Sequence, residues 1–399
     1  MEEKLQVAGF QAGAVKAGIR GKDRLDVALI YSEVPAAAAG VFTTSKVKAA
    51  PVLLDMEYLQ GGKAQAIIVN SGIANACTGK PGMELALGTS RLVAGQLGIA
   101  DELVLVSSTG VIGQQLDLSI FSNCMKPLAA SLRKDGFSDV ARAMMTTDTV
   151  PKTARREVQL SGNKKITLLG LAKGSGMIMP NMATMLSFIV TDAAVHASVL
   201  QEMLGQSVAK SFNAITVDGD TSTNDTVLLL ANGKAGNAEI CSLDSADGRL
   251  FHQCLDDLCL DLALQIVKDG EGATKLITVH VKRAASRQEA DQAARTVANS
   301  SLVKTAFFGE DANWGRIIAA LGRSGIDVDP DRVDISFDEV LMVRDGLGLG
   351  PQQEKLATSV LKKKAFSVVI DLKNGQSEAK VYTCDLSVEY IRINADYRS

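Results

Sequence analysis

Short apolar runs that end in polar, glycine-containing turns recur along the first half of the chain. Val, Ile and Leu dominate these runs, as is typical of buried β-strands, and we expect strands at residues 26–32, 64–72, 102–110 and 185–193. Residues 158–172 carry two such runs separated by Ser161-Gly162-Asn163, which predicts a hairpin. The first half is therefore expected to be rich in β-structure.

The second half alternates between helical and strand patterns. Apolar residues recur at helical spacing over residues 195–212 and again over 245–269, which predicts two amphipathic helices. The remaining elements are expected as strands at 226–233, 275–283 and 332–343, helices at 287–300 and 313–325, and a hairpin over 366–386 that turns at Asn374-Gly375. Together the two halves predict an α+β protein whose mixed sheets are covered by helices.

Composition narrows the class of protein. The chain has 399 residues, of which 46% are hydrophobic and 22% charged, so it is long enough for two or three units with buried cores. A net charge of −3 and an aromatic share of 4% argue against binding to nucleic acid or an anionic membrane. The sequence shows no secretory leader, no apolar run of ~18 residues and no C-x-x-C pair among its six cysteines. We expect a cytoplasmic protein with reduced thiols.

Several familiar binding motifs are only partly matched. Residues 174–179 and 346–351 begin like dinucleotide-binding loops, but the first lacks the third glycine and the second has proline where a helix should start. Residues 218–229 resemble a calcium loop, yet Thr223 replaces the turn glycine and Leu229 replaces the bidentate glutamate. This last segment is expected instead to form a polar turn or the wall of a site.

Histidine is scarce in this sequence. Only His196, His252 and His280 occur, and none of them belongs to a metal-binding spacing. We expect structural roles for all three and no zinc site. A hydroxyl nucleophile in this chain would therefore need lysine or an N-terminal α-amine as its base.

One threonine would carry such an amine if the chain were cut before it. Two groups of turn-forming residues, Gly174-Ser175-Gly176 and Pro180-Asn181, precede Thr184, and an apolar run follows it. Attack of its Oγ on the preceding carbonyl, followed by hydrolysis of the ester, would open the Ala183–Thr184 bond and free an α-amine with a reference pKa of ~7.7–8.0. That reaction needs a strained turn and an oxyanion site. On the residues alone, an ordinary loop that enters a strand is the simpler interpretation.

The segment that contains Thr184 belongs to a much longer pattern. Residues 173–193, KGSGMIMPNMATMLSFIVTDA, closely resemble the self-cleavage segment of the ornithine acetyltransferase family, the bacterial glutamate N-acetyltransferases of arginine biosynthesis. The resemblance also covers residues 40–52, 69–79, 107–116, 145–152, 211–226, 268–275, 307–325 and 394–399. Several of these segments are long and unlike common structural repeats, so the resemblance is highly specific.

The resemblance implies a fold, an assembly and an activity. The fold would be a layered α/β/β/α-type sandwich of the ornithine acetyltransferase and aminopeptidase type. Self-cleavage would give an α chain of residues 1–183 and a β chain of residues 184–399, the latter with a smaller C-terminal subdomain over about residues 280–399, assembled as an α2β2 heterotetramer. The enzyme would transfer acetyl from N2-acetyl-L-ornithine to L-glutamate in a ping-pong cycle that needs no metal or organic cofactor. Some family members also accept acetyl-CoA as the donor.

The resemblance also implies the site residues, position by position. Thr184 would be the nucleophile, and the Thr109 hydroxyl and the Gly110 backbone N–H would form the oxyanion hole. The substrate-binding positions would be Thr147, Lys173, Thr184, Glu271, Asn394 and Ser399. Lys173 suits a substrate carboxylate, and Glu271 suits the ammonium of ornithine.

Three positions depart from the family pattern. Met179 stands where many relatives have histidine, Ala312 where proline is common, and Ser399 where threonine is frequent. Two alternative functions are also considered. One is an N-terminal-nucleophile aminopeptidase or amidase in which water is the acceptor, and the other is an uncleaved amino-acid-binding protein on the same scaffold.

Overall fold

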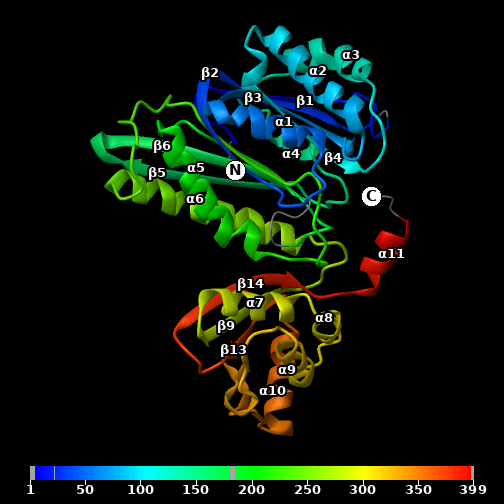
Figure 1. Cartoon of the computed structure of the whole chain (residues 1–399), viewed down its shortest axis with the longest axis vertical. Coiled ribbons are helices and arrows are strands. Elements are labelled where there is room, and N and C mark those ends of the chain that lie inside the picture. The colour runs from blue at the N-terminus through cyan, green and yellow to red at the C-terminus, as the bar shows by residue number, and fades with distance from the viewer. Residues whose placement is uncertain (1–4, 22, 180–184, 397–399) are drawn as a thin grey trace. The chain divides into compact units, whose positions relative to one another are not determined.

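The chain folds into two units (Figure 1). The computed structural model describes residues 5–21, 23–179 and 185–396. Within these, the first unit contains residues 5–213 and 220–266, and the second contains residues 214–219 and 267–396. No helix in this described part of the chain is long and apolar enough to cross a membrane.

An eight-stranded sheet organises the first unit. Its long strand β2 (Val27–Phe42) pairs with its neighbours in two stretches, with a register shift between Tyr31 and Ala36. The first stretch pairs with β1 and β3, and the last pairs with β8. The other strands are β1 (Phe10–Val15), β3 (Lys63–Ile73), β4 (Val104–Val111), β5 (Lys152–Leu160), β6 (Lys164–Lys173), β7 (Leu186–Thr191) and β8 (Thr226–Ala231), in the order β4-β3-β2-β8-β7-β6-β5.

Alternating side chains of these strands build a layered sandwich. Ile30 of β2 shares one buried core with Phe188 of β7 and Leu228 of β8, so the two halves of the sheet face each other. The neighbouring residue Leu29 points the opposite way, into a core with the helices of the outer layer. Gly170 of β6 lies against the other outer layer, formed by α6. The expected α/β/β/α layering is therefore confirmed.

Helices cover both outer faces of the sandwich (Figure 1). On the β1–β4 side they are α1 (Ala50–Tyr58), α2 (Gly79–Leu97) and α3 (Leu118–Ala130). The short α4 (Phe137–Ala143) instead packs into the inner core, against β1 and β2. On the other side they are α5 (Ala197–Lys210) and α6 (Ala246–Lys268), which confirm the two helices expected from the periodicity of residues 195–212 and 245–269.

A six-stranded sheet organises the second unit. Its strands run in the order β12 (Leu347–Gly348), β11 (Val340–Arg344), β10 (Asp334–Phe337), β13 (Ala365–Asp371), β9 (Leu276–Ala284) and β14 (Ser377–Cys384). The helices are α7 (Arg287–Ala298), α8 (Ser301–Phe308), α9 (Trp314–Gly322), α10 (Pro351–Leu361) and α11 (Val388–Asp396). Buried aliphatic side chains of β9, β10 and β13 pack against α7, α9 and α10 to form a separate core.

The prediction of a hairpin that turns at Asn374-Gly375 is wrong. Strands β13 and β14 do flank this segment, but β9 lies between them, parallel to β13 and antiparallel to β14. The connection must therefore span two strand spacings, about 10 Å, which a two-residue turn cannot do. Gly375 is needed for another reason: a Cβ there would lie 2.2 Å from the Ala284 carbonyl oxygen.

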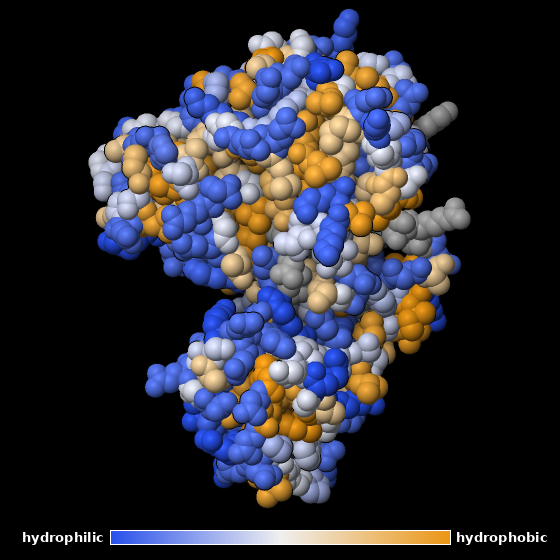
Figure 2. Space-filling view, viewed as in Figure 1, coloured by the Kyte–Doolittle hydropathy of each residue, from blue (hydrophilic) through white to orange (hydrophobic). Residues whose placement is uncertain are grey.

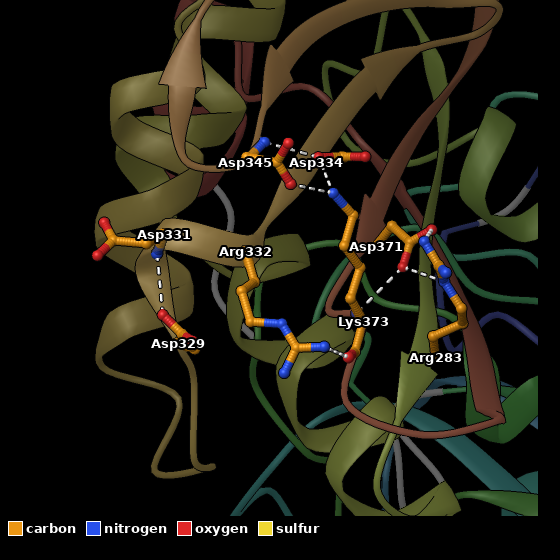
Figure 3. Close-up of polar contacts among 8 residues, drawn as sticks. All are labelled: Arg283, Asp329, Asp331, Arg332, Asp334, Asp345, Asp371 and Lys373. Carbon is orange, nitrogen blue, oxygen red and sulfur yellow. Dashed lines mark hydrogen bonds and ion pairs between the residues drawn. The ribbon is translucent and has the colours of Figure 1, made fainter.

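A network of charged residues anchors the same connection (Figure 3). Lys373 Nζ lies 2.5 Å from Asp334 Oδ1 and 2.6 Å from Asp345 Oδ1. Beside it, Arg283 donates two hydrogen bonds of 2.7 Å to the carboxylate of Asp371. The hydrogen bonds and charge of Lys373 outweigh partial burial and lower the pKa of Asp334.

The surface mixes polar and apolar side chains. On the face shown in Figure 2, orange apolar areas are separated by blue polar ones. Among the described residues, the most exposed large apolar side chains are Leu347, Ile391 and Leu302, with exposed fractions of 73%, 65% and 63%. All three belong to the second unit.

Candidate active site

The ends of β3 and β4 form a tightly built edge of the first unit. The two strands are parallel, and Gly72 lies opposite Gly110 in their register. Gly110 has a φ of +132°, and a Cβ at this position would lie 2.2 Å from the carbonyl carbon of Gly72. Only glycine fits here, because the backbones approach too closely for any side chain.

Two buried asparagines hold this edge in place. Asn224 Nδ2 donates to the carbonyl oxygens of Ala74 and Ser108, at 2.6 and 2.8 Å. Asn70 Nδ2 donates to the Ile73 carbonyl at 2.9 Å, and its Oδ1 accepts from the Ser108 hydroxyl at 2.7 Å. The backbone just before Thr109 and Gly110 is thus fixed from two sides.

Lys173, the last residue of β6, brings its ammonium group to the same edge. Its side chain is almost completely buried. Lys173 Nζ donates to Thr109 Oγ1 at 3.3 Å and to Thr146 Oγ1 at 2.7 Å. Burial lowers the pKa of Lys173, and the carboxylate charges of Asp148 and Asp225 oppose that shift. A buried cation therefore donates a hydrogen bond to the hydroxyl of Thr109, one of the residues that the family resemblance implies for an oxyanion hole.

Asp148 provides the main counter-charge for this cation. Its Oδ1 accepts from Lys152 Nζ at 2.6 Å and from the Gly174 N–H at 2.7 Å, while its Oδ2 accepts from the Thr146 N–H at 2.9 Å. Burial alone would raise the pKa of Asp148, but the charges of Lys173 and Lys152 and these hydrogen bonds lower it to about 2. The carboxylate is therefore ionised at neutral pH.

The loop that carries Thr146 is tied to the N-terminal segment. Arg20 donates to the carbonyl oxygens of Met145 and Thr146, the latter at 3.0 Å. Thr147, the residue named from the sequence, is half-buried on this loop. Its neighbour Thr146, which the sequence did not single out, is the threonine that accepts the hydrogen bond from Lys173.

The backbone after Lys173 turns in an unusual way. Met177 has a φ of +57°, a left-handed conformation that is uncommon for a residue other than glycine. Met179 is half-buried. Ala183 and Thr184 lie outside the described residues. The described chain resumes at Met185, whose N–H donates to Asp225 Oδ1 at 2.8 Å.

Two further residues named from the sequence meet in the second unit. Asn394 Nδ2, on α11, donates to Glu271 Oε2 at 2.7 Å, and Glu271 is buried. Asp385 stabilises the same loop by accepting from the N–H groups of Thr274 and Lys275 at 2.8 and 2.9 Å. The structure thus brings together Glu271 and Asn394, whereas Ser399 lies outside the described residues.

The three histidines take part in contacts elsewhere in the chain. His196 Nδ1 lies 2.9 Å from the Ser198 hydroxyl, His280 contacts Glu378 at 3.0 Å, and His252 lies 3.5 Å from Asp256. In the described ranges, no three His, Cys, Asp or Glu residues are grouped as metal ligands would be. The site in the first unit instead contains ammonium and hydroxyl groups together with the buried side chains of Asp148 and Asp225.

Comparison with known proteins settles the family. The family model described as ArgJ family matches residues 11–399. The chain belongs to this family. It is 56% identical over 395 residues to the arginine biosynthesis bifunctional protein ArgJ of Desulfotalea psychrophila, covering 99% of this chain and 100% of that protein. Identity to the protein of the same name from Syntrophotalea carbinolica is 54%, with the same coverage.

A solved structure gives a further match. The arginine biosynthesis bifunctional protein ArgJ from Bacillus halodurans is 43% identical, with a TM-score of 0.51, and the match covers 53% of this chain and 98% of that chain. Membership of the ArgJ family confirms the resemblance seen in the sequence. It also confirms the expected enzyme class, an acyltransferase of arginine biosynthesis.

Proposed function

We propose that the protein is a glutamate N-acetyltransferase that transfers acetyl from N2-acetyl-L-ornithine to L-glutamate. The observation that carries this proposal is the contact of Lys173 Nζ with the hydroxyls of Thr109 and Thr146. It places a buried cation, able to bind a carboxylate, beside a hydroxyl suited to an oxyanion hole. Family membership supports the reaction class.

The first half-reaction would form an acetyl ester on Thr184. Thr184 Oγ attacks the acetyl carbonyl carbon, and the Oγ proton passes to the α-amine of the same residue. The Thr109 hydroxyl and the Gly110 N–H donate to the oxyanion that forms, each stabilising it by ~2.7–4 kcal/mol. The carbon–nitrogen bond then breaks, the nitrogen of ornithine takes the proton, and ornithine leaves.

The second half-reaction would return the enzyme to its starting state. The neutral amine of glutamate attacks the ester carbonyl, the same two donors stabilise the oxyanion, and Thr184 Oγ leaves with a proton from the attacking nitrogen. The products are N-acetylglutamate and free Thr184. Proton transfer within one residue needs no histidine, which agrees with the structural contacts of all three histidines.

Charge complementarity assigns the substrate groups. Lys173, with Thr147 nearby on the loop, would bind the substrate carboxylate, because the lysine is cationic and buried. Glu271 and Asn394 are proposed as substrate-binding residues on the family pattern, and the Glu271 carboxylate, which accepts a hydrogen bond from the Asn394 amide, suits an ammonium group. Ser399 is proposed as a further substrate contact on the basis of the family pattern alone.

Self-cleavage at Ala183–Thr184 would create the nucleophile and divide the chain into residues 1–183 and 184–399. The left-handed backbone at Met177 supports a constrained turn before the cleavage point. A second observation also supports the division: the match to the Bacillus halodurans chain covers nearly all of that chain but about half of this one. We further propose an α2β2 assembly in the cytoplasm.

The relatives' names contain the word bifunctional, which supports a second donor. We propose that acetyl-CoA also acylates Thr184, so that glutamate is acetylated without N-acetylornithine. No cofactor is assigned to either reaction.

The direct test compares wild type with Thr184→Ala on a denaturing gel and in an acetyl-transfer assay. Wild type should give two chains and the variant one, with no transfer activity. Cleavage of the variant would overturn the assignment of the nucleophile. If N-acetylornithine is hydrolysed at a rate that glutamate does not change, the protein is an amidase. If wild type stays full-length and inactive, it is a binding protein.

A further inference from the structure

Arg20 is a cation beside the site to which the mechanism above gives no role. It lies in the segment between β1 and β2. Its guanidinium donates to the backbone carbonyl oxygens of Met145 and Thr146, the latter at 3.0 Å. Both carbonyls belong to the loop that follows α4, and the hydroxyl of Thr146 on this loop accepts from Lys173 Nζ at 2.7 Å. One residue, Thr146, therefore links the guanidinium of Arg20 to the buried ammonium of Lys173.

The backbone of Arg20 is itself held in place. The carboxylate of Asp26 is completely buried, and it accepts from the Arg20 N–H at 3.0 Å and from the Ala17 N–H at 2.6 Å. The carbonyl oxygen of Asp26 accepts from the N–H of Ser71 on β3 at 2.9 Å. Arg20 is thus anchored to the end of β3 that belongs to the site, before its side chain makes any contact.

The side chain of Arg20 crosses β3 at a glycine. Gly72 has a φ of +107°, and a Cβ there would lie 2.6 Å from Arg20 Cγ and 2.9 Å from Ile19 Cγ2. Gly72 leaves room for the arginine stem, and it lies opposite Gly110 in the register of β3 and β4. A single side chain therefore runs from the proposed oxyanion edge to the loop that contacts Lys173.

We propose that Arg20 determines specificity as a positioning residue: it holds the loop of Thr146, so that the Thr146 hydroxyl orients the Lys173 ammonium for the substrate carboxylate. The inference rests on the proposed function, which assigns the carboxylate of N2-acetyl-L-ornithine to Lys173. Arg20 acts through these two residues and takes no part in proton transfer.

Arginine suits this task for a geometric reason. The two carbonyl oxygens, of consecutive residues, accept from different nitrogens of the guanidinium, Nη1 and Nη2. The planar fork of arginine makes two such bonds with little loss of side-chain freedom, whereas the ammonium of lysine is a point charge on a flexible stem. Arg20 therefore fixes the loop more firmly than a lysine would.

The charge of Arg20 also reaches Lys173. Burial is the main cause that lowers the pKa of Lys173, the positive charges of Lys152 and Arg20 lower it further, and the carboxylates of Asp148 and Asp225 oppose the shift. An anion bound at Lys173 would be attracted by Arg20 as well. The electrostatics thus agree with a carboxylate site at this place.

Arg156 provides a matched control in the same unit. It is half-buried on β5, its Nη1 donates to the Arg155 carbonyl at 2.9 Å, and its Nη2 donates to Asp261 of α6 at 2.7 Å. It pairs with Leu168, five residues before Lys173 on β6. Arg156→Met therefore also removes a guanidinium and its hydrogen bonds, but none of those bonds reaches the loop of Thr146.

The experiment compares wild type with Arg20→Met, Arg20→Lys and Arg156→Met, each checked for folding by its urea midpoint. We would measure kcat and KM for N2-acetyl-L-ornithine, and the inhibition constant of N-acetyl-1,4-diaminobutane, the same molecule without its carboxylate. Arg20→Met should raise KM about 10-fold and leave kcat and the inhibition constant within about 3-fold. Arg20→Lys should recover part of the affinity, and Arg156→Met should stay within about 2-fold of wild type.

Loss of affinity for the carboxylate-bearing ligand alone supports the proposal, because a general disturbance of the site would weaken both ligands. The proposal is overturned if KM and the inhibition constant rise together, if KM is unchanged, or if Arg156→Met raises KM equally. Should Arg20→Met not fold, the same comparison in Arg20→Lys decides. Wild type separates the two levels of inference: without acetyl transfer by wild type the proposed function fails, whereas normal transfer with an unaltered Arg20→Met refutes only the role of Arg20.

Discussion

Asp148 Oδ1 lies 2.6 Å from Lys152 Nζ, and both side chains are completely shielded from solvent. The charge of Lys173 acts on the same carboxylate. Two buried ammonium groups therefore act on the Asp148 carboxylate, and the ammonium of Lys173 lies where it contacts the hydroxyls of Thr109 and Thr146. A carboxylate ligand would give this buried ammonium a further counter-charge, which is why we assign the substrate carboxylate to Lys173.

Replacement of Asp148 should therefore destabilise the first unit strongly. Asp148→Asn removes a buried carboxylate that Lys152 contacts directly and that stabilises the charge of Lys173, and the free energy of unfolding should fall by about 3–5 kcal/mol in urea titration. The control is Lys165→Met, which breaks the ion pair with Glu157 at an exposed site. It should cost less than about 1 kcal/mol. Equal effects of the two variants would contradict the buried charge cluster.

The same carboxylate should control stability at acid pH. Its folded-state pKa of about 2 is below the unfolded value of ~3.9, so it contributes stability that is complete above about pH 4 to 5 and is lost as the pH falls towards 2. The loss should be about 2 kcal/mol over this window, measured as the urea midpoint at each pH. In Asp148→Asn the slope should be smaller. A profile parallel to wild type would argue against the depressed pKa.

Gly110 should be irreplaceable for reasons of space. In Gly110→Ala the new Cβ would overlap the Gly72 carbonyl at 2.2–2.3 Å and would require a φ of +132°, so the strand ends must separate. The unfolding free energy should drop by more than about 3 kcal/mol, and transfer activity should be lost with the oxyanion donors.

Gly113→Ala is the matched control for that variant. Gly113 follows the same strand with a φ of +80°, but its Cβ would meet no atom within 4 Å. It should cost only about 1 kcal/mol of backbone strain and keep most of the activity. If both variants unfold at the same urea concentration, close packing at Gly110 is not the cause of the lost stability in Gly110→Ala.

In the second unit, Lys373→Met tests the network of Figure 3. Lys373 lowers the pKa of Asp334, so the pair contributes stability above the unfolded pKa of ~3.9 that is lost as the pH falls below it. Both side chains remain partly exposed, so the variant should lose only about 0.5–1 kcal/mol at pH 7. The difference from wild type should shrink towards pH 3. A constant difference in urea midpoints across this range would contradict the assignment.

The sequence predicted the positions of the strands along the chain better than it predicted which strands pair. Periodicity located β7, β8 and β9, but it contains no information on which strand lies beside which. The Asn374-Gly375 signal failed for this reason, because β9, nearly a hundred residues earlier, enters between β13 and β14. Helix α2 was missed because it contains Pro81 and four glycines. One of them, Gly88, lies where a Cβ would come within 2.8 Å of Leu118, so glycine permits close packing there.

The sequence predicted some residues of the candidate site and missed others. Family resemblance named Lys173, Thr109 and Gly110, and the structure places Lys173 against Thr109. Residues 218–229, which include Asp225, were expected to form a polar turn or the wall of a site, but nothing in the sequence singled out Asp225 or Asp148, because acidic residues in polar loops look the same whether they are solvated or buried. Their importance appears only once burial and distances are known.

Thr146 offers the sharpest test of how the site is held together. Thr146→Val keeps the side-chain shape but removes the 2.7 Å hydrogen bond to Lys173 Nζ, which leaves a buried ammonium with one fewer acceptor. Loss of such a bond corresponds to about 1–3 kcal/mol, so kcat/KM for N-acetylornithine should fall roughly 10- to 100-fold. If Lys173 binds the substrate carboxylate, most of the change should appear in KM. Thr153→Val, half-buried on β5, should leave both constants within about 2-fold of wild type. A fall in kcat with KM unchanged would instead place Lys173 in the chemical step, beside the oxyanion.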